Sequence, residues 1–202
     1  MIKLFITDID GCLTDGGYFS PSIPEISIKV SPPSCDDRDT RLQLTPQFYL
    51  RKFNTCDFVG IQMLSNAGIQ CVALTGSYEP SMPQFERAGR KIIVCAGVQD
   101  KFDFVRSTYV ECSDRPGKCS WDEIAFIGDE INDCALLAAV GLSACPADAA
   151  REVIAVVENK SDTMIGEGFV MSRKGGELCV REFTDMIRDM QNIKASWCNW
   201  EE

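Results

Sequence analysis

The fold is decided by the stretch Asp8-Ile9-Asp10-Gly11-Cys12-Leu13-Thr14-Asp15-Gly16, which follows a short apolar segment at residues 1–7. The apolar segment predicts a buried strand. Side chains alternate along a strand, so Asp8 and Asp10 leave its end on the same side. Like charges this close repel unless a cation or a shared proton intervenes, and Gly11 lets the backbone turn close to a ligand. Taken alone, these residues also fit a polar turn; their position predicts a divalent-metal and phosphate site where open α/β sheets bind ligands.

Composition limits the classes of protein to consider. The 202 residues, 45% hydrophobic and 25% charged, are those of an ordinary globular domain. No apolar run approaches the roughly 20 residues needed to span a bilayer, and no secretory signal opens the chain, so we expect a cytoplasmic protein without a membrane partner. The net charge of −10, without a basic run, argues against nucleic acid as a partner. A phosphate ester remains compatible because a bound cation inverts the local field.

The cysteines and the missing histidine restrict the chemistry further. Eleven cysteines, an odd number without a Cys-x-x-Cys pair, favour reduced thiols in apolar segments over a disulfide framework. The absence of histidine excludes Ser-His-Asp and Cys-His catalysis, imidazole bases and most zinc sites. Carboxylates, Lys, Ser/Thr and Cys remain, and such a set suits an oxygen-ligated Mg²⁺.

Two further predicted strands, at residues 69–74 and 91–96, also lead into polar residues. The first ends in Thr75-Gly76-Ser77, where a hydroxyl and backbone N–H groups can donate to a phosphoryl oxygen; a plain glycine turn is the alternative. After the second, Lys101 stands at the start of a helix, the end that the helix dipole makes unfavourable for a cation. Such local conflicts are typical of functional sites, although a solvated surface lysine also fits.

The most informative later segment is Gly128-Asp129-Glu130-Ile131-Asn132-Asp133, which follows a predicted strand within residues 121–127. A helix cap needs one Asp or Asn, whereas this turn holds several. A second acidic cluster at a second strand end makes a metal site the better interpretation of both clusters. Residues 141–146 and 155–157 are predicted as short closing strands around a helix.

Three other segments complete the prediction. Residues 17–52, rich in Pro and Ser toward the middle, predict a β-hairpin with a long loop, which is either a lid, a subunit-joining arm or a plain surface excursion. In the helix that follows, Thr55 or Asp57 serves either as N-cap or as part of an anion and hydroxyl site. Residues 172–202 form a C-terminal tail and helix, opened by a Gly-rich stretch that is either a turn or a phosphate-contacting tail.

Strands and helices that alternate in this way predict an α/β fold with a doubly wound parallel sheet, one domain over residues 1–202 and no cap domain. The polar residues at successive strand ends resemble, in order, the four motifs of the haloacid dehalogenase (HAD) superfamily of phosphatases. They are Asp8-x-Asp10, Thr75, Lys101 and Gly128-Asp129…Asp133.

Within that superfamily the chain resembles the capless group that dephosphorylates 2-keto-3-deoxy sugar acids. Substrates of the group are 3-deoxy-manno-octulosonate 8-phosphate (KDO 8-phosphate) and the nonulosonate 9-phosphates, such as 2-keto-3-deoxynononate (KDN) 9-phosphate and N-acylneuraminate 9-phosphate. The resembling stretches are Thr7-Asp8-Ile9-Asp10-Gly11, Thr14-Asp15-Gly16, Lys52-Phe53-Asn54-Thr55-Cys56-Asp57, Ile127-Gly128-Asp129, Lys174-Gly175-Gly176-Glu177 and Arg181-Glu182-Phe183. The resemblance implies a homotetramer in which the hairpin and the Gly-rich tail of neighbouring subunits help to close the active site.

The resemblance also implies roles for the motif residues. Asp8 attacks phosphorus and forms an aspartyl-phosphate, and Asp10 protonates the leaving oxygen and then activates water. Mg²⁺ is held by Asp8, the Asp10 backbone carbonyl and Asp129. Thr75 and Lys101 hold the phosphoryl oxygens.

By the same resemblance Asp133 orients Lys101 or a water molecule at the metal. The residues expected to contact the substrate are Asn54, Thr55, Cys56, Asp57, Phe58, Gly76, Asn132 and Lys174. Ser77 stands where the octulosonate enzymes usually carry Arg and a nonulosonate enzyme carries Glu, so the sugar acid stays open.

Two alternatives to a sugar-acid phosphatase also stay open. Residues 141–149 resemble the C-terminal domain of animal CMP-sialic acid synthetases, which shares the fold without evident phosphatase residues. The chain is then a non-catalytic assembly domain, although Asp8, Asp10 and Lys101 are intact. The other alternative is a HAD phosphatase for a different small metabolite.

Overall fold

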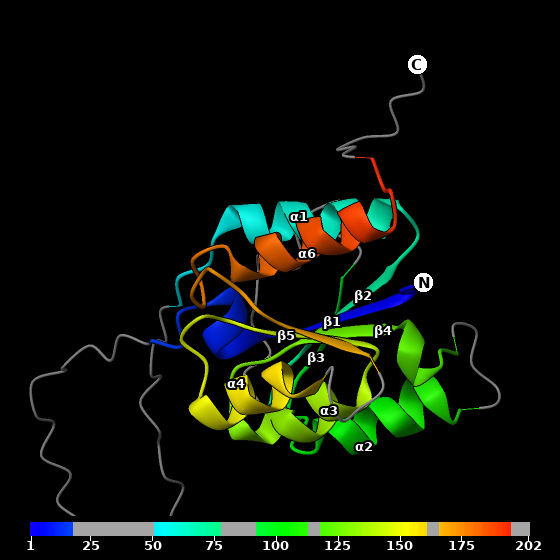
Figure 1. The fold of residues 1–202 in the computed structure, drawn as a ribbon, viewed down its shortest axis with the longest axis horizontal. Coiled ribbons are helices and arrows are strands. Elements are labelled where there is room, and N and C mark those ends of the chain that lie inside the picture. The colour runs from blue at the N-terminus through cyan, green and yellow to red at the C-terminus, as the bar shows by residue number, and fades with distance from the viewer. Residues whose placement is uncertain (18–50, 78–91, 113–117, 161–165, 195–202) are drawn as a thin grey trace, which may run out of the picture. The chain divides into compact units, whose positions relative to one another are not determined.

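In the described part of the chain, a six-stranded, all-parallel sheet carries helices on both faces (Figure 1). The computed structural model describes residues 1–17, 51–77, 92–112, 118–160 and 166–194. The strands are β1 (Leu4–Asp8), β2 (Gln70–Leu74), β3 (Ile92–Cys95), β4 (Ile124–Ile127), β5 (Leu142–Cys145) and β6 (Glu167–Val170). The helices are α1 (Thr55–Asn66), α2 (Lys101–Val105), α3 (Cys134–Ala139), α4 (Arg151–Glu158) and α6 (Cys179–Met190). The predicted doubly wound parallel sheet is confirmed.

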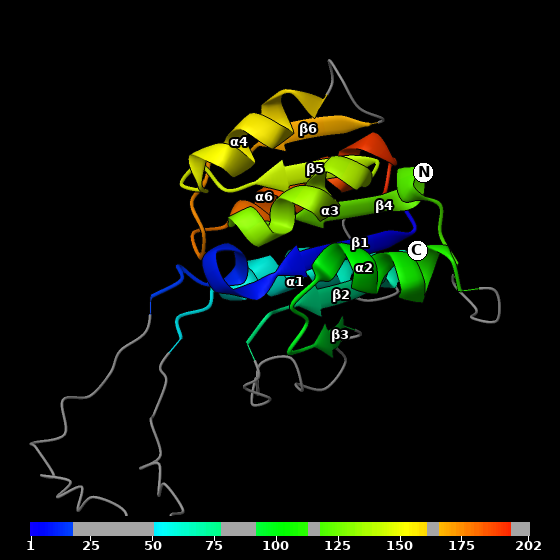
Figure 2. The same ribbon diagram turned by 90° about the horizontal axis from the view of Figure 1, so that it is seen from below.

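The strand order β3-β2-β1-β4-β5-β6 places β1 at the centre of the sheet (Figure 2). From β1 the chain adds β2 and β3 on one side and β4 to β6 on the other, so the order reverses between β1 and β4. Open α/β sheets bind ligands at the carboxyl ends of strands beside such a reversal. In register, Asp8 pairs with Leu74 and Thr7 with Ile127. The residues that follow β1, β2 and β4 therefore emerge together at one edge.

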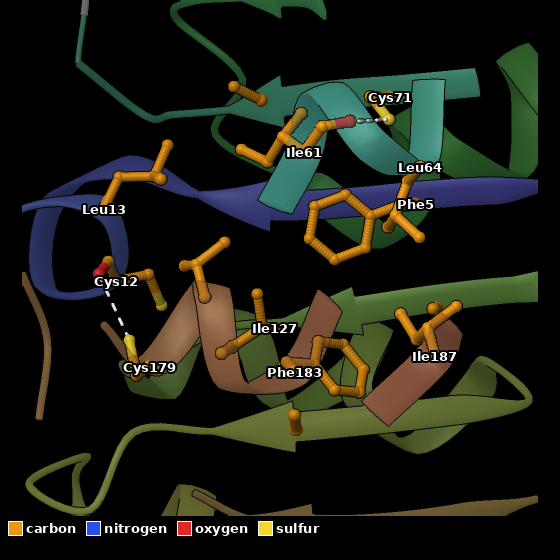
Figure 3. Close-up of a cluster of buried hydrophobic side chains, with 14 of the residues drawn as sticks. Phe5, Cys12, Leu13, Ile61, Leu64, Cys71, Ile127, Cys179, Phe183 and Ile187 are labelled. Atoms are coloured by element: carbon orange, nitrogen blue, oxygen red, sulfur yellow. Dashed lines mark hydrogen bonds between the residues drawn. The ribbon is translucent and has the colours of Figure 1, made fainter. Parts of the chain in front are cut away.

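The core is split by the sheet into two layers, because successive strand residues point to opposite faces. Phe5 contributes to the layer under α1 and α6, where Phe183 packs against it with ring centroids 6.0 Å apart (Figure 3). Leu4 and Ile6 contribute to the layer under α2, α3 and α4. All five residues of β1 are buried, as expected for a central strand covered on both faces.

One predicted element is wrong. Residues 155–157 were expected to form a strand, but they lie inside α4, where Val153 and Val157 are buried one helical turn apart and Ala155 is exposed. Three apolar residues in a row are too few to show the helical period. Among the described residues the last strand is β6, in which Phe169 and Val170 follow Glu167 and Gly168, and this apolar run is too short to predict a strand.

The predicted hairpin at residues 17–52 lies largely outside the described residues. Its base is described: Thr14 and Phe53 form an antiparallel bridge, so the chain leaves and re-enters the domain at neighbouring points. Of the described helices, none combines the length and the apolar character that crossing a bilayer requires.

Candidate active site

The four motif segments meet at the carboxyl edge of the sheet. Asp8 is the last residue of β1, Thr75 follows β2, Lys101 opens α2, and Asp129 follows β4. These residues are separated by up to 121 positions in the chain, yet the parallel register of β1, β2, β3 and β4 brings the ends of their strands to the same edge. The predicted convergence of the four segments is therefore present.

Lys101 links the first and the last of these segments. Its side chain is 1% exposed, and its Nζ lies 2.9 Å from Asp8 Oδ1 and 2.6 Å from Asp133 Oδ1. Burial by itself lowers the pKa of Lys101, but the charges of Asp8 and Asp133 outweigh it and hold the pKa above its usual value. The ammonium group stays charged and fixed, and the surface-lysine interpretation is wrong.

Asp133 is a fully buried carboxylate whose two oxygens both accept hydrogen bonds. Oδ1 accepts from Lys101, and Oδ2 accepts from the backbone N–H groups of Asp129 at 3.1 Å and Glu130 at 3.3 Å. A Cβ on Gly128 would lie 2.6 Å from Asp133 Cγ, so only glycine fits beside this carboxylate. Asp133 therefore holds both Lys101 and the turn that carries Asp129.

Asp8 and Asp133, which contact Lys101, form a cluster with a third carboxylate, Asp129. Oxygens of Asp8, Asp129 and Asp133 lie within 4.8 Å of one another. Burial raises the pKa of Asp8 to about 6, against the opposing charge of Lys101. Burial, with the charges of Asp8 and Asp133, raises the pKa of Asp129 to about 8. A set of clustered carboxylate oxygens with excess negative charge fits a hard divalent cation, so the residues present are suited to hold one.

The turn after β1 approaches this cluster at Gly11. Gly11 has φ of 91°, and a Cβ there would lie 1.9 Å from Asp129 Oδ2. Glycine is therefore required both by the backbone conformation and by the close approach of Asp129. The Thr14 hydroxyl donates to Asp10 Oδ1 at 3.3 Å and accepts from the Gly16 N–H at 3.2 Å. Asp10 is half-buried, and its carboxylate is oriented by its own loop.

Thr75 and Gly76 form the turn after β2. Thr75 is 3% exposed, and its hydroxyl oxygen accepts from the Ser77 N–H at 3.0 Å. The hydroxyl keeps its own proton, which it can donate to an acceptor. Gln99 Nε2 donates to the Gly76 carbonyl at 2.8 Å and ties this turn to the segment before α2.

The residues predicted to line the substrate pocket from α1 fall into two groups. Asn54 is the N-cap, since its side chain accepts from the Cys56 N–H at 3.0 Å, so neither Thr55 nor Asp57 caps this helix. Thr55 and Cys56 are exposed. Asp57 is fully buried and Phe58 is 3% exposed in the core. The expected substrate contact is corrected for Asp57 and Phe58, whose side chains point into the interior.

Asp57 caps a different helix. Its Oδ1 accepts from the Arg181 N–H at 2.7 Å, in the first turn of α6, while Oδ2 is buried without a hydrogen-bond partner. Burial raises the pKa of Asp57 to about 6. α1 and α6 also pack closely here: a Cβ on Gly60 would lie 2.1 Å from Thr184 Oγ1. The carboxylate joins α1 to α6, a role that its place in the sequence did not reveal.

The remaining predicted substrate residues, Asn132 and Lys174, are exposed. The glycine pair next to Lys174 packs against the turn after β1 of the same chain. A Cβ on Gly175 would lie 2.0 Å from the Gly11 carbonyl oxygen, and the Gly176 N–H donates to the Cys12 carbonyl at 2.9 Å. This segment is therefore a tight turn with glycine at the points of closest approach.

A second buried lysine was missed by the sequence analysis. Lys160 is fully buried, and its Nζ donates to the carbonyls of Leu137 at 2.6 Å and Ala138 at 3.1 Å, at the end of α3. Burial lowers the pKa of Lys160 to about 8. Its partners are backbone carbonyls, so no acidic residue in the sequence marked it.

Comparison with known proteins gives two kinds of relative, although no family model matches the chain. N-acylneuraminate cytidylyltransferase B of Danio rerio is 28% identical over 99% of this chain, which spans 39% of that protein's length. The 3-deoxy-D-manno-octulosonate 8-phosphate phosphatase of Haemophilus influenzae is 28% identical over 94% of this chain and 84% of its own.

Solved structures agree with the second kind. A cobalt-bound deoxy-D-mannose-octulosonate 8-phosphate phosphatase from Haemophilus influenzae is 27% identical with a TM-score of 0.62, over 95% of this chain and 90% of that one. The Moraxella catarrhalis 3-deoxy-D-manno-octulosonate 8-phosphate phosphatase, in complex with a magnesium ion, a phosphate ion and KDO, shares the fold. Its TM-score is 0.68 at 20% identity, over 95% of this chain and 88% of that one.

The resemblance expected from the motifs is therefore confirmed: in sequence and fold the chain is similar to HAD-superfamily phosphatases of the KDO 8-phosphate type, which are phosphoric monoester hydrolases.

Proposed function

We propose that the chain is a Mg²⁺-dependent phosphatase that hydrolyses the phosphate monoester of a 2-keto-3-deoxy sugar acid through an aspartyl-phosphate. The observation that carries this proposal is Lys101, which is bound between Asp8 and Asp133, two members of the carboxylate cluster that also contains Asp129. A buried carboxylate held by a fixed ammonium group, with a second carboxylate free to share a cation, is suited to accept a phosphoryl group.

In the first step an Asp8 oxygen forms a bond to phosphorus, and the bond from phosphorus to the sugar oxygen breaks. Asp10 gives its proton to that leaving oxygen; its orientation by Thr14 supports this role. In the second step water attacks the aspartyl-phosphate and gives its proton to Asp10, which releases Asp8 and inorganic phosphate. Lys101 and the Thr75 hydroxyl hold the phosphoryl oxygens through both steps.

Mg²⁺, when bound, neutralises charge on the phosphoryl group during transfer. Asp8, Asp129 and the Asp10 carbonyl would hold it. Asp133 lies within the same cluster, but both of its oxygens already accept hydrogen bonds, so we assign it to orienting Lys101 and the Asp129 turn. The cobalt and magnesium ions bound by the two similar phosphatases support a divalent cation here.

The substrate class rests on the relatives. The phosphatases are named for KDO 8-phosphate and the cytidylyltransferases for N-acylneuraminate, and both names denote 2-keto-3-deoxy sugar acids. Either KDO 8-phosphate or a nonulosonate 9-phosphate is therefore the proposed substrate, with Asn54, Thr55, Cys56, Gly76, Asn132 and Lys174 as proposed contacts. The homotetramer and the cytoplasmic location stay predictions.

A second candidate function is a non-catalytic assembly domain. Its support is the match of 99% of this chain to 39% of the cytidylyltransferase. The intact Asp8, Asp10 and Lys101 favour the phosphatase.

The test is phosphate release in the presence of Mg²⁺ from KDO 8-phosphate, KDN 9-phosphate, N-acylneuraminate 9-phosphate and a hexose phosphate. The proposal predicts strong preference for one keto-acid ester, and no turnover by a folded Asp8→Asn variant. Weak and equal turnover of all substrates would indicate another metabolite. No release from any of them by folded, Mg²⁺-bound protein would favour the assembly domain.

A further inference from the structure

Cys12 lies between the metal-site carboxylates and the C-terminal glycine turn. Its side chain is fully buried, and its Sγ donates to Asp129 Oδ1 at 3.7 Å. Its backbone carbonyl accepts from the Gly176 N–H at 2.9 Å and from the Cys179 thiol at 3.3 Å, a contact that Figure 3 shows. One residue therefore contacts both a proposed metal ligand and the segment that packs behind it.

The thiol is suited to be a donor here and not a ligand. In the contact with Asp129 the thiol is the donor and the carboxylate oxygen the acceptor. Cys12 also belongs to the buried layer under α1 and α6, which prevents the side chain from turning outward. The donor is weak, but it is fixed and excluded from water.

The backbone of Asp129 is already held at both of its polar groups. Its N–H donates to Asp133 Oδ2 at 3.1 Å, and its carbonyl accepts from the Ala150 N–H at 2.9 Å. These contacts fix the turn and leave the carboxylate to rotate about its side-chain bonds. The Cys12 thiol on one oxygen and the bare Gly11 backbone beside the other define where the carboxylate can lie.

We propose that Cys12 is a positioning residue for the metal site: its thiol holds the Asp129 carboxylate in the orientation that faces Asp8. The glycine turn at Gly175 and Gly176 in turn holds Cys12. The inference rests on the proposed metal site and adds a residue that acts on it through Asp129. Outer hydrogen bonds of this kind orient metal ligands and set their affinity.

The test compares Mg²⁺ binding, measured by isothermal titration calorimetry at pH 7 on substrate-free protein, in the wild type and three Cys12 variants. Cys12→Ala removes the donor, and Cys12→Val removes it while filling the volume, which keeps the test open if the alanine variant unfolds. Both should bind Mg²⁺ roughly threefold to tenfold more weakly, as expected for the loss of one weak hydrogen bond to a ligand. Cys12→Ser keeps a donor and should recover most of the affinity.

Cys71→Ala is the matched control. Cys71 is another buried thiol of the same layer, 1% exposed, and it donates to the carbonyls of Ile61 and Ile69. It lies near the start of β2, at the opposite end of the sheet from Asp8. Its loss should lower stability without changing Mg²⁺ affinity.

The outcomes separate this inference from the proposed function. A wild-type protein that binds no Mg²⁺ would overturn the proposed metal site and the inference with it. Wild-type Mg²⁺ affinity in folded Cys12→Ala and Cys12→Val would overturn the inference alone. If the serine variant bound Mg²⁺ as weakly as the alanine variant, the hydrogen bond would not set the affinity, and Cys12 would be a packing residue only.

Discussion

Replacing Lys101 with methionine tests whether this lysine is the counter-ion of the acidic cluster. Methionine keeps most of the volume and removes the charge that lies 2.6 Å from Asp133 and 2.9 Å from Asp8. Removal of one partner from a buried ion pair costs about 3–5 kcal/mol, because the other charge stays buried without compensation. A domain of this size is stable by about 5–15 kcal/mol, so the variant should lose about a fifth of its stability or more.

The matched control is Lys160→Met. Lys160 is as deeply buried as Lys101, but it donates to the carbonyls of Leu137 and Ala138 and not to acids. Losing those hydrogen bonds should cost about 1–3 kcal/mol. Burial already lowers the pKa of Lys160 to about 8, because the charged form is unfavourable in the interior. Methionine removes this unfavourable charge and so offsets part of the stability lost with the hydrogen bonds.

The assay is urea unfolding at pH 7, first with EDTA and then with saturating Mg²⁺. At a hundred times its Kd, a ligand that binds only the folded state adds about 2.7 kcal/mol. Without Lys101 the carboxylates attract the cation more strongly, so the Mg²⁺ increment should exceed that of the wild type. In Lys160→Met the stability gained from Mg²⁺ should equal that of the wild type. The reasoning is refuted if the Lys101 variant loses no more stability than the Lys160 variant and gains no more from Mg²⁺.

Three further predictions follow from the buried carboxylates and the glycine turn. Asp57→Ala should lower the free energy of unfolding by about 0.5–2 kcal/mol through loss of the α6 cap, whereas Asp57→Asn keeps an acceptor and should be nearly neutral. Urea unfolding compares the two variants, and equal losses of stability would exclude a capping role. Gly175→Ala should lower the free energy of unfolding by about 1–3 kcal/mol, because its Cβ would lie 2.0 Å from a backbone oxygen. Gly76→Ala, whose added Cβ would have its nearest neighbouring atom 3.7 Å away, should leave thermal stability unchanged, and similar melting temperatures for both variants would contradict this packing. Metal-free protein should lose stability as pH rises from about 4 to about 8. Burial raises the folded-state pKa of Asp8 to about 6 and of Asp129 to about 8, above the value of about 4 for an unfolded Asp, so protons bind the folded state more tightly. Saturating Mg²⁺ should reduce this loss of stability, and a metal-free stability that does not change with pH in urea unfolding would contradict the prediction.

The sheet and the convergence of the motifs were predictable because the central strands carry strong sequence signals. β1 and β4 are buried along their whole length, so each appears as an apolar run that ends in acidic residues. Parallel strands place their carboxyl ends at one edge, so Asp8 and Asp129 had to meet once both strands were recognised. β6 was not predicted because only Phe169 and Val170 of its four residues have apolar side chains, too short a run to indicate a strand.

The contacts that could not be predicted join side chains to backbone groups distant in the sequence. Asp57 accepts from a backbone N–H 124 residues away, and Lys160 donates to carbonyls at the end of α3. Every residue has such backbone groups, so the sequence holds no mark of which one a side chain will meet. The packing of Gly175 on the turn after β1 has the same character, because a glycine alone indicates flexibility as readily as close approach.

The buried charges also help to decide which of the two kinds of relative, phosphatase or cytidylyltransferase, this chain is more like in function. Lys101 and Asp133 are 1% and 0% exposed, and removing such groups from water costs several kcal/mol for each ion before their mutual attraction is counted. Well-packed apolar residues in the same places are often neutral or stabilising, so a domain that served only for assembly would gain nothing from this arrangement. An additional carboxylate, Asp129, adds repulsion that Lys101 alone does not cancel. A protein that binds a cation and a phosphoryl group at this edge needs all of these groups, and this is the physical reason to favour catalysis.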